Sequence, residues 1–315
     1  MTWTASCRCW AFAWTNRQRV SLFYGMAHLT PKHDRFKGLG FALMWSFSLL
    51  GVLLGGSGCQ DERPYDALGE HALAAATALV EAHPQREAGV HSQAVAEWLA
   101  ARLGEGATLQ PFETPLGTMV NVIKMTPNPV AILVSHTDTK VGIEGFVGAN
   151  DGASTTGLLL TLAQETDLPV VYLFVDGEEC RTRYTATDGL HGSWYFAKTR
   201  QDLKHLPVIV LDMLGDKGFN PGLAENATYA LNRTLATAAR KAGVPLLNAG
   251  EIVDDHVPFL VEGWQATDVI DFDYGPNHQW WHTAEDTLDK LSAQSLAQTA
   301  KLICKTVELL KKDRQ

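Results

Sequence analysis

The middle of the chain carries VAILVS at residues 130–135, VVYLFV at residues 170–175 and VIVL at residues 208–211. Each run is short, apolar throughout and followed by polar residues, and helical patterns at 154–166 and 190–199 separate the runs. Strands that are apolar on both faces and alternate with helices are typical of a parallel sheet covered on both sides. We therefore predict an α/β fold, a three-layer sandwich whose central mixed, mostly parallel sheet is flanked by helices.

Periodic patterns on either side of these runs extend the prediction. Apolar residues at helical spacing predict four further helices, at 64–83, 89–103, 229–242 and 292–312. Alternation predicts a strand pair over 109–125 with a turn at Leu116 and Gly117, and a later strand at 267–272. No internal repeat or linker divides residues 59–315, so we expect a single catalytic domain there.

Residues 38–58 read GLGFALMWSFSLLGVLLGGSG, without one charged side chain. Lys32, Arg35 and Lys37 precede this stretch and Cys59 follows it, an order typical of a secretory signal that ends at a lipidated cysteine. We predict that residues 1–58 are an export leader of the lipoprotein type, with a retained membrane anchor or ordinary cleavage as alternatives. The protein is then expected at the bacterial cell envelope, on the periplasmic side of a membrane.

The charge balance excludes some partners. The chain has 26 basic and 35 acidic residues, a net charge of −9. Without the six basic residues and one acidic residue of 1–58, the remainder has 20 basic and 34 acidic residues, a net charge of −14. Nucleic acid is therefore excluded as a partner, because phosphate binding needs clustered Lys and Arg. The five cysteines form no CxxC pair, which argues against a disulfide scaffold or a cysteine-built zinc finger.

Polar residues follow the predicted strands or precede the next helix. They are His136, Asp151, Glu178, Glu179, Asp212 and His282. In an open parallel sheet such positions converge beyond the carboxyl ends of the strands. Carboxylates and imidazoles that converge there need a cation to compensate them, and zinc suits this set of ligands. The doubled Glu178 and Glu179 allow one to bind metal while its neighbour acts as a general base.

The order HTD, GANDGAS, DGEE, LDMLGD and WHTAEDT resembles the zinc aminopeptidase superfamily with co-catalytic metals. Within it, the chain is most similar to glutaminyl-peptide cyclotransferases, in five segments. These are FVGANDGA (146–153), FVDGEEC (174–180), TDGLHGS (187–193), DDHVPFL (254–260) and WHT (281–283). The resemblance covers the chain from Pro64 to its end and implies a zinc-aminopeptidase-like fold.

The resemblance also implies roles for particular residues. A single zinc would be held by Asp151, Glu179 and His282, and Glu178 would be the acid and base. Asp212 and Asp254 would form a hydrogen-bonded acidic pair beside it.

The resemblance also places three residues in the substrate pocket. Trp281 would form its wall with Ile252 nearby, and Tyr184 stands where the family often has a pocket Trp. Residues 273–280 (DYGPNHQW) differ from the pocket loop of the animal enzymes, and the family's paired cysteines beside the first metal Asp are absent. These departures concern substrate preference more than chemistry.

The function that follows from the resemblance is zinc-dependent cyclisation of an N-terminal glutamine of peptides or proteins to pyroglutamate, with release of ammonia. Its partners would be peptide N-termini, and we expect a monomer. The alternative enzyme is a two-zinc aminopeptidase, in which His136 and Asp212 bind the second metal and Glu178 deprotonates a metal-bound water. A non-catalytic binding lipoprotein on the same fold would lack a ligand or the base, and none is missing.

Overall fold

The computed structural model describes residues 63–185 and 187–314. The predicted leader at 1–58 and Cys59 lie outside the described residues, so the leader stays a prediction. In the described part of the chain, no helix is both long enough and apolar enough to cross a bilayer.

Within the described residues, one eight-stranded sheet has the order β1-β2-β4-β3-β5-β8-β6-β7. The strands are β1 (Ala107–Thr114), β2 (Gly117–Met125), β3 (Ala131–His136), β4 (Val170–Val175), β5 (Val208–Asp212), β6 (Gly222–Ala224), β7 (Leu247–Gly250) and β8 (Ala266–Ile270). The central strands β4, β3, β5 and β8 are parallel, while β1, β2 and β6 each run antiparallel to a neighbour. The sheet is therefore mixed and mostly parallel, as predicted.

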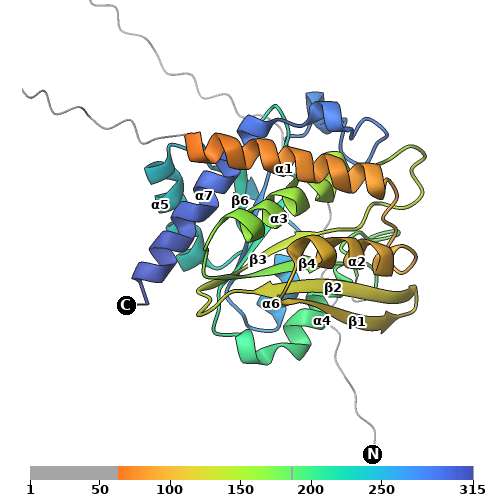
Figure 1. Cartoon of the computed structure of the whole chain (residues 1–315), viewed down its shortest axis with the longest axis horizontal. Helices are drawn as coiled ribbons and strands as arrows, with labels where there is room; N and C mark the ends of the chain where they lie inside the picture. The colour runs from red at the N-terminus through yellow and green to blue at the C-terminus, as the bar shows by residue number, and fades with distance from the viewer. Residues whose placement is uncertain (1–62, 186, 315) are drawn as a thin grey trace, which may run out of the picture. The chain divides into compact units, whose positions relative to one another are not determined.

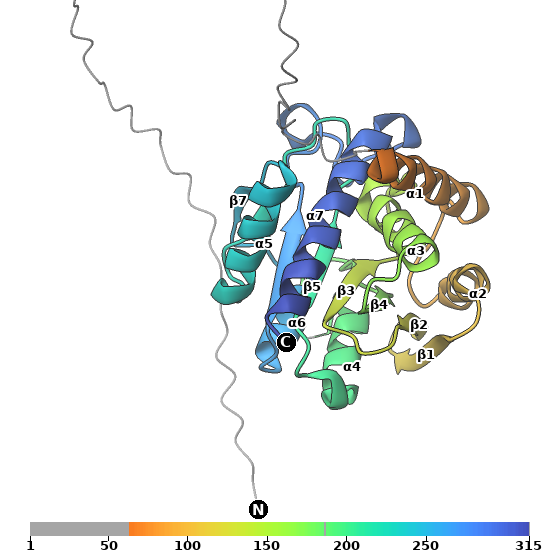
Figure 2. The ribbon, with the colours of Figure 1, turned by 60° about the vertical axis from the view of Figure 1, so that its left-hand side comes forward.

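Helices cover both faces of this sheet (Figures 1 and 2). They are α1 (Arg63–Ala82), α2 (Ser92–Leu103), α3 (Thr155–Glu165), α4 (His191–Thr199), α5 (Tyr229–Ala242), α6 (His256–Val261) and α7 (Ala293–Lys312). Side chains of α1, α2, α3, α5 and α7 pack in one apolar cluster, whereas α4 and α6 pack in another with the opposite face of the strands. This arrangement confirms the three-layer sandwich.

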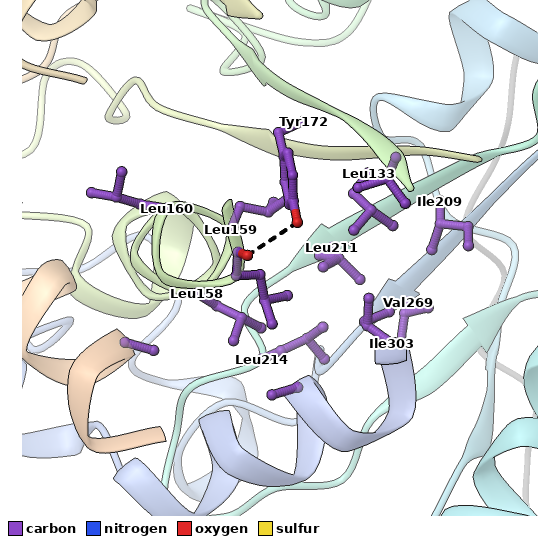
Figure 3. Close-up of a cluster of buried hydrophobic side chains, with 14 of the residues drawn as sticks. Leu133, Leu158, Leu159, Leu160, Tyr172, Ile209, Leu211, Leu214, Val269 and Ile303 are labelled. Carbon is purple, nitrogen blue, oxygen red and sulfur yellow. Dashed lines mark hydrogen bonds between the residues drawn. The ribbon is translucent and has the colours of Figure 1, made fainter. Parts of the chain in front are cut away.

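The central strands are buried on both faces. Every residue of β3, β4 and β5 is buried, and Figure 3 shows the leucine-rich cluster that fills one side of them. Tyr172 on β4 lies in this cluster and donates its hydroxyl to the Leu162 carbonyl at 3.1 Å, so its polar atom is satisfied. β-Branched and aromatic side chains on both faces favour extended backbone, which explains why these apolar runs form strands rather than helices.

The sequence patterns predicted the bounds of most helices and strands to within a few residues. Helix α5 occupies the predicted residues, and it ends where Gly243 adopts a left-handed φ of 69° that terminates the helix. Helix α7 begins after Ser292, whose side chain accepts the Ser295 N–H at 3.3 Å. Strand β8 begins at Ala266, one residue earlier than predicted, and ends at Ile270. The short elements β6, β7 and α6 have no predicted counterpart.

Candidate metal and catalytic site

The carboxyl ends of the parallel strands bring distant residues together. His136 is the last residue of β3, Asp212 is the last residue of β5, and Glu178 follows β4 by three residues. Strand β3 pairs with both β4 and β5, so these three ends lie side by side at one edge of the sheet. The predicted convergence of these residues is confirmed.

Asp151 reaches the same place from an irregular turn, η1 (Ala149–Ser154), at the start of α3. Gly152 in this turn has a φ of 93°, and an added Cβ would lie 2.8 Å from the His136 ring. Glycine therefore permits both the backbone conformation and the close approach to His136. As a result, Asp151 Oδ1 lies 3.1 Å from His136 Nε2.

Asp286 holds the η1 turn in place, a role that sequence analysis did not assign. Its carboxylate accepts the N–H groups of Asn150 at 2.8 Å and Asp151 at 3.1 Å, and the Tyr274 hydroxyl at 2.6 Å. The Asn150 side chain donates to the Met213 carbonyl at 3.0 Å, in the loop that follows β5. The turn that carries Asp151 is thereby tied to the end of the strand that carries Asp212. The position of Asp286 within the WHTAEDT motif was its only signal in the sequence.

Arg86 fixes the same region from the other side. Its guanidinium is buried and donates to the carbonyls of Thr137, Val147 and Gly148 at 2.8–2.9 Å. One side chain therefore joins the loop after β3 to the loop before η1. Nothing in the local sequence around Arg86 indicated this role, because these three carbonyls lie more than fifty residues away.

Asp138 anchors the two glutamates. Its carboxylate accepts the backbone N–H of Glu178 at 3.0 Å and that of Glu179 at 3.1 Å. Asp138 also lies 3.6 Å from His136 Nδ1. It stands two residues after His136 in the HTD motif, so its proximity to His136 was predictable, but its role in anchoring the glutamates was not.

Two overlapping groups of side chains have the arrangement of a metal site. Asp151, Glu179 and His282 offer ligand atoms that lie within 4.8 Å of one another, and so do His136, Asp151 and Asp212. In the first group, His282 Nε2 lies 3.0 Å from Glu179 Oε1 and 3.3 Å from Asp151 Oδ2. In the second, His136 Nε2 lies 3.2 Å from Asp212 Oδ1. The first group is the set predicted for a single zinc, and the second contains both residues predicted for a second metal.

The donor set of the first group fits zinc, which takes imidazole nitrogen and carboxylate oxygen ligands. The buried Asp151 Oδ2 accepts no hydrogen bond of good geometry from any described residue and lies 3.3 Å from His282 Nε2. His282 adopts a φ of 52°, a conformation that costs energy for a residue with a side chain. This strained backbone turns the His282 ring toward the two carboxylates.

Glu178 lies beside this group. Burial, and then the charge of Glu179, raise the pKa of Glu178 well above its usual range. Its Oε1 accepts a hydrogen bond from the Tyr184 hydroxyl at 2.7 Å. A buried carboxyl whose pKa is raised beside metal-ligating groups has the properties of a general base or acid.

Asp212 and Asp254, the predicted acidic pair, are both buried, and their pairing stays a prediction. Asp212 Oδ1 lies 3.2 Å from His136 Nε2, and the Asp254 carboxyl accepts the backbone N–H of Asp255. Asp268, a buried residue of β8, is a further carboxyl whose charge acts on that of Asp254. Strand β8 lies next to β5 and carries Asp268 within an otherwise mostly apolar strand. Burial raises the pKa of both Asp212 and Asp254 to about 7. Sequence analysis missed Asp268 because it read that segment as an uninterrupted strand.

The predicted pocket residues have different surroundings. The Trp281 ring stacks on the His282 ring with centroids 4.0 Å apart, and meets Phe272 edge-on at 4.9 Å. Tyr184 is half-buried, and its hydroxyl donates a hydrogen bond to Glu178. It therefore contacts the candidate base in addition to its predicted place in the pocket wall. Ile252 lies in the loop after β7, where its N–H donates to the Asn226 side chain at 2.9 Å.

Comparison with known proteins identifies the family. The profile of Peptidase family M28 matches residues 119–307, which is more than half of the chain. The chain belongs to peptidase family M28. It is also 33% identical to the solved structure of an Acidobacteriales bacterium glutaminyl cyclase, with a TM-score of 0.71, covering 78% of this chain and 95% of that one. The similarity to glutaminyl cyclases seen in the motifs is thereby confirmed.

Two further relatives of this M28 chain define the limits of the similarity. The glutaminyl-peptide cyclotransferase of Bothrops jararaca is 26% identical over 245 residues, which cover 60% of this chain and 66% of that protein. The chain therefore spans slightly less than two thirds of the length of this relative. A leucine aminopeptidase precursor from Bacteroides thetaiotaomicron shares the fold at 22% identity, with a TM-score of 0.63, covering 76% of this chain and 96% of that one.

The buried carboxyls of this M28 chain predict an unusual pH dependence for the metal-free protein. Burial raises the pKa of Asp212, Asp254 and Asp255 from 3.8 to about 7, so between pH 4 and 7 the folded state binds more protons than the unfolded state. Stability therefore falls as pH rises through this window, on the order of 3 kcal/mol for one such carboxyl. Thermal unfolding after chelation, measured from pH 5 to pH 7, should show a falling midpoint.

A matched variant tests the cause of this slope. Burial also raises the pKa of Asp268, so Asp268→Asn removes one carboxyl of the same kind and should flatten the decline. A midpoint that rises with pH over this window would show that these carboxyls are ionised in the folded protein.

Proposed function

We propose that this chain is a glutaminyl-peptide cyclotransferase, which converts the N-terminal glutamine of peptides or proteins to pyroglutamate and releases ammonia. The observation that carries the proposal is the 33% identity to a bacterial glutaminyl cyclase over 95% of that chain. The geometry supports it, because a compact group of three metal-ligand side chains lies beside a buried glutamate.

Asp151, Glu179 and His282 would hold one zinc ion, which when bound polarises the γ-carbonyl of the substrate glutamine. The α-amine of the same residue is the nucleophile, so the reaction gains from the high effective concentration of a tethered group. Trp281, Tyr184 and Ile252 are the residues we assign to the pocket that holds the glutamine side chain.

Glu178 carries the proton. As the α-nitrogen forms its bond to the γ-carbon, Glu178 takes a proton from the amine. It then returns that proton to the side-chain nitrogen as the carbon–nitrogen bond of the amide breaks, and the nitrogen leaves as ammonia. Asp254 adds a buried carboxyl whose charge acts on Glu178. We assign Asp212 and Asp254 to steadying the leaving nitrogen.

The alternative is a two-zinc aminopeptidase, which the second ligand group of His136, Asp151 and Asp212 would serve. However, His136 Nε2 already contacts Asp151 at 3.1 Å and Asp212 at 3.2 Å. A protonated His136 compensates the charge of both carboxylates. Burial by itself lowers the pKa of His136, but the neighbouring carboxylates outweigh burial and raise this pKa well above its usual range. His282 contacts Asp151 and Glu179 in the same way, so these contacts do not distinguish the two groups, and the choice of cyclisation rests on the identity to a glutaminyl cyclase.

The deciding experiment offers the purified, zinc-loaded protein two peptides that differ only in a first residue of Gln or Leu. We expect the Gln peptide to lose the mass of one ammonia, with matching ammonia release, while the Leu peptide stays intact. Removal of the first residue from the Leu peptide, with no cyclisation of the Gln peptide, would replace the proposal by the aminopeptidase.

We also propose that residues 1–58 export the enzyme as a lipoprotein of the cell envelope, and that residues 59–315 are its catalytic domain, acting as a monomer. The uncharged stretch 38–58 before Cys59 supports export. Metabolic labelling with palmitate tests this, because Cys59→Ser should abolish the label if Cys59 carries the lipid.

A further inference from the structure

Glu178 and Glu179 are adjacent glutamates with the same anchorage. Both side chains are buried, and both backbone N–H groups donate to the Asp138 carboxylate. Neither the backbone nor burial therefore distinguishes a general base from a metal ligand. The difference lies in what touches the oxygen atoms of each side chain.

At Glu178, a neutral donor occupies one oxygen. The Tyr184 hydroxyl donates to Oε1 at 2.7 Å, while Oε2 accepts no hydrogen bond from the residues that the structure describes. A neutral phenol fixes the carboxylate without neutralising its charge, so the second oxygen stays free to take a proton.

The loop that carries Tyr184 is built to hold it there. The Asp188 carboxylate accepts the backbone N–H groups of Arg181 at 2.6 Å, Thr182 at 3.0 Å and Arg183 at 3.3 Å. Gly189 lies under the Tyr184 ring, where an added Cβ would stand 2.6 Å from a ring carbon. The Tyr184 phenol is therefore supported by the hydrogen bonds of its loop and by packing of its ring against Gly189.

At Glu179, a cation occupies one oxygen. Lys140 Nζ lies 3.2 Å from Oε2, and the same ammonium donates to the Cys180 carbonyl, which holds it in place. The other oxygen, Oε1, lies 3.0 Å from His282 Nε2 and belongs to the group of metal-ligand atoms. An ammonium on one oxygen favours the ionised carboxylate and leaves a single oxygen to face the metal.

We propose that Tyr184 and Lys140 are positioning residues that divide the two adjacent glutamates between two tasks. Tyr184 orients Glu178 as the base, and Lys140 orients Glu179 as a metal ligand that binds through one oxygen. The Tyr184 half rests on the proposed function, whereas the Lys140 half concerns metal binding alone.

The Lys140 half is tested by zinc affinity, measured by competition with a chromogenic chelator. Lys140→Met removes the ammonium and keeps the length of the side chain, and it should weaken zinc binding about tenfold to a hundredfold. Lys140→Arg restores a cation and should recover most of the affinity. Lys124→Met is the matched control, because Lys124 also donates to a backbone carbonyl, that of Leu103, at 2.5 Å but not within this site.

The Tyr184 half is tested by kinetics at saturating zinc. Tyr184→Phe removes one oxygen atom and should lower kcat about tenfold to a hundredfold, with KM and zinc affinity unchanged. Tyr172→Phe is the matched control, because it removes the hydrogen bond of another phenol, to the Leu162 carbonyl, outside this site. Melting temperatures of all variants separate these effects from loss of fold.

Three outcomes would overturn the inference: unchanged zinc affinity in Lys140→Met, unchanged kcat in Tyr184→Phe, or equal losses of zinc affinity in both variants. These outcomes differ from a failure of the proposed function. If the wild-type protein hydrolyses the Leu peptide instead, Glu178 is still the base, and the Tyr184→Phe loss must appear in that reaction. A wild-type protein with neither activity overturns the Tyr184 half, while zinc affinity still decides the Lys140 half.

Discussion

Glu178→Gln is expected to lower kcat for cyclisation of a Gln-initiated peptide by about 10³-fold, the size of effect typical of a lost general base. The amide that replaces the carboxylate has nearly the same shape, and its oxygen can still accept the hydrogen bond from the Tyr184 hydroxyl. The amide cannot, however, take the proton of the attacking amine. KM and zinc affinity should stay unchanged, because Glu178 is not among the grouped ligand atoms. Steady-state kinetics and chelator competition on the same preparation check this.

The control for Glu178→Gln is Glu105→Gln, which makes the same chemical change at an exposed position between α2 and β1. This control should be as active as the wild type, which shows that the loss of one negative charge is harmless by itself. If Glu178→Gln kept a large part of the wild-type kcat, another group would be the base and the assignment of Glu178 would be wrong.

Removal of zinc by a chelator is expected to abolish activity and to lower the melting temperature. The activity is lost because the γ-carbonyl is no longer polarised, and stability is lost because the carboxylates of Asp151 and Glu179 keep only histidine and lysine partners. When the free zinc concentration is a hundred times the Kd, zinc binding raises the free energy of unfolding by about 2.7 kcal/mol. One equivalent of zinc should restore both properties, as followed by ammonia release and thermal unfolding.

Two histidine variants separate one metal from two. His282→Ala removes a ligand of the first group and should prevent zinc from restoring activity. His136→Ala removes a ligand of the second group only, and it should leave zinc stoichiometry at one per chain. A rate that keeps rising to a second equivalent of zinc, and that depends on His136, would establish the second metal and contradict the single-zinc proposal.

The central sheet and the main helices were predictable because their signals are local. Strand β4 and helix α5 occupy the residues predicted for them, since a doubly apolar run and a 3.6-residue period both lie within a few residues of chain. Strands β6 and β7 were not predictable in this way. Their sequences, Gly222–Ala224 and Leu247–Gly250, have weak strand preference, and they become strands only by pairing with β8 and with each other.

For the site, the sequence by itself determined which polar residues converge, because the ends of successive strands in an open parallel sheet must meet. His136, Asp151, Glu179 and Asp212 could be named from this rule. What only the tertiary structure decided is how each is held: Asp286 and Arg86 secure the η1 turn, and Tyr184 and Lys140 contact different glutamates. These contacts join residues that are mostly tens of positions apart in the chain, and such pairs leave no periodic signal in the sequence.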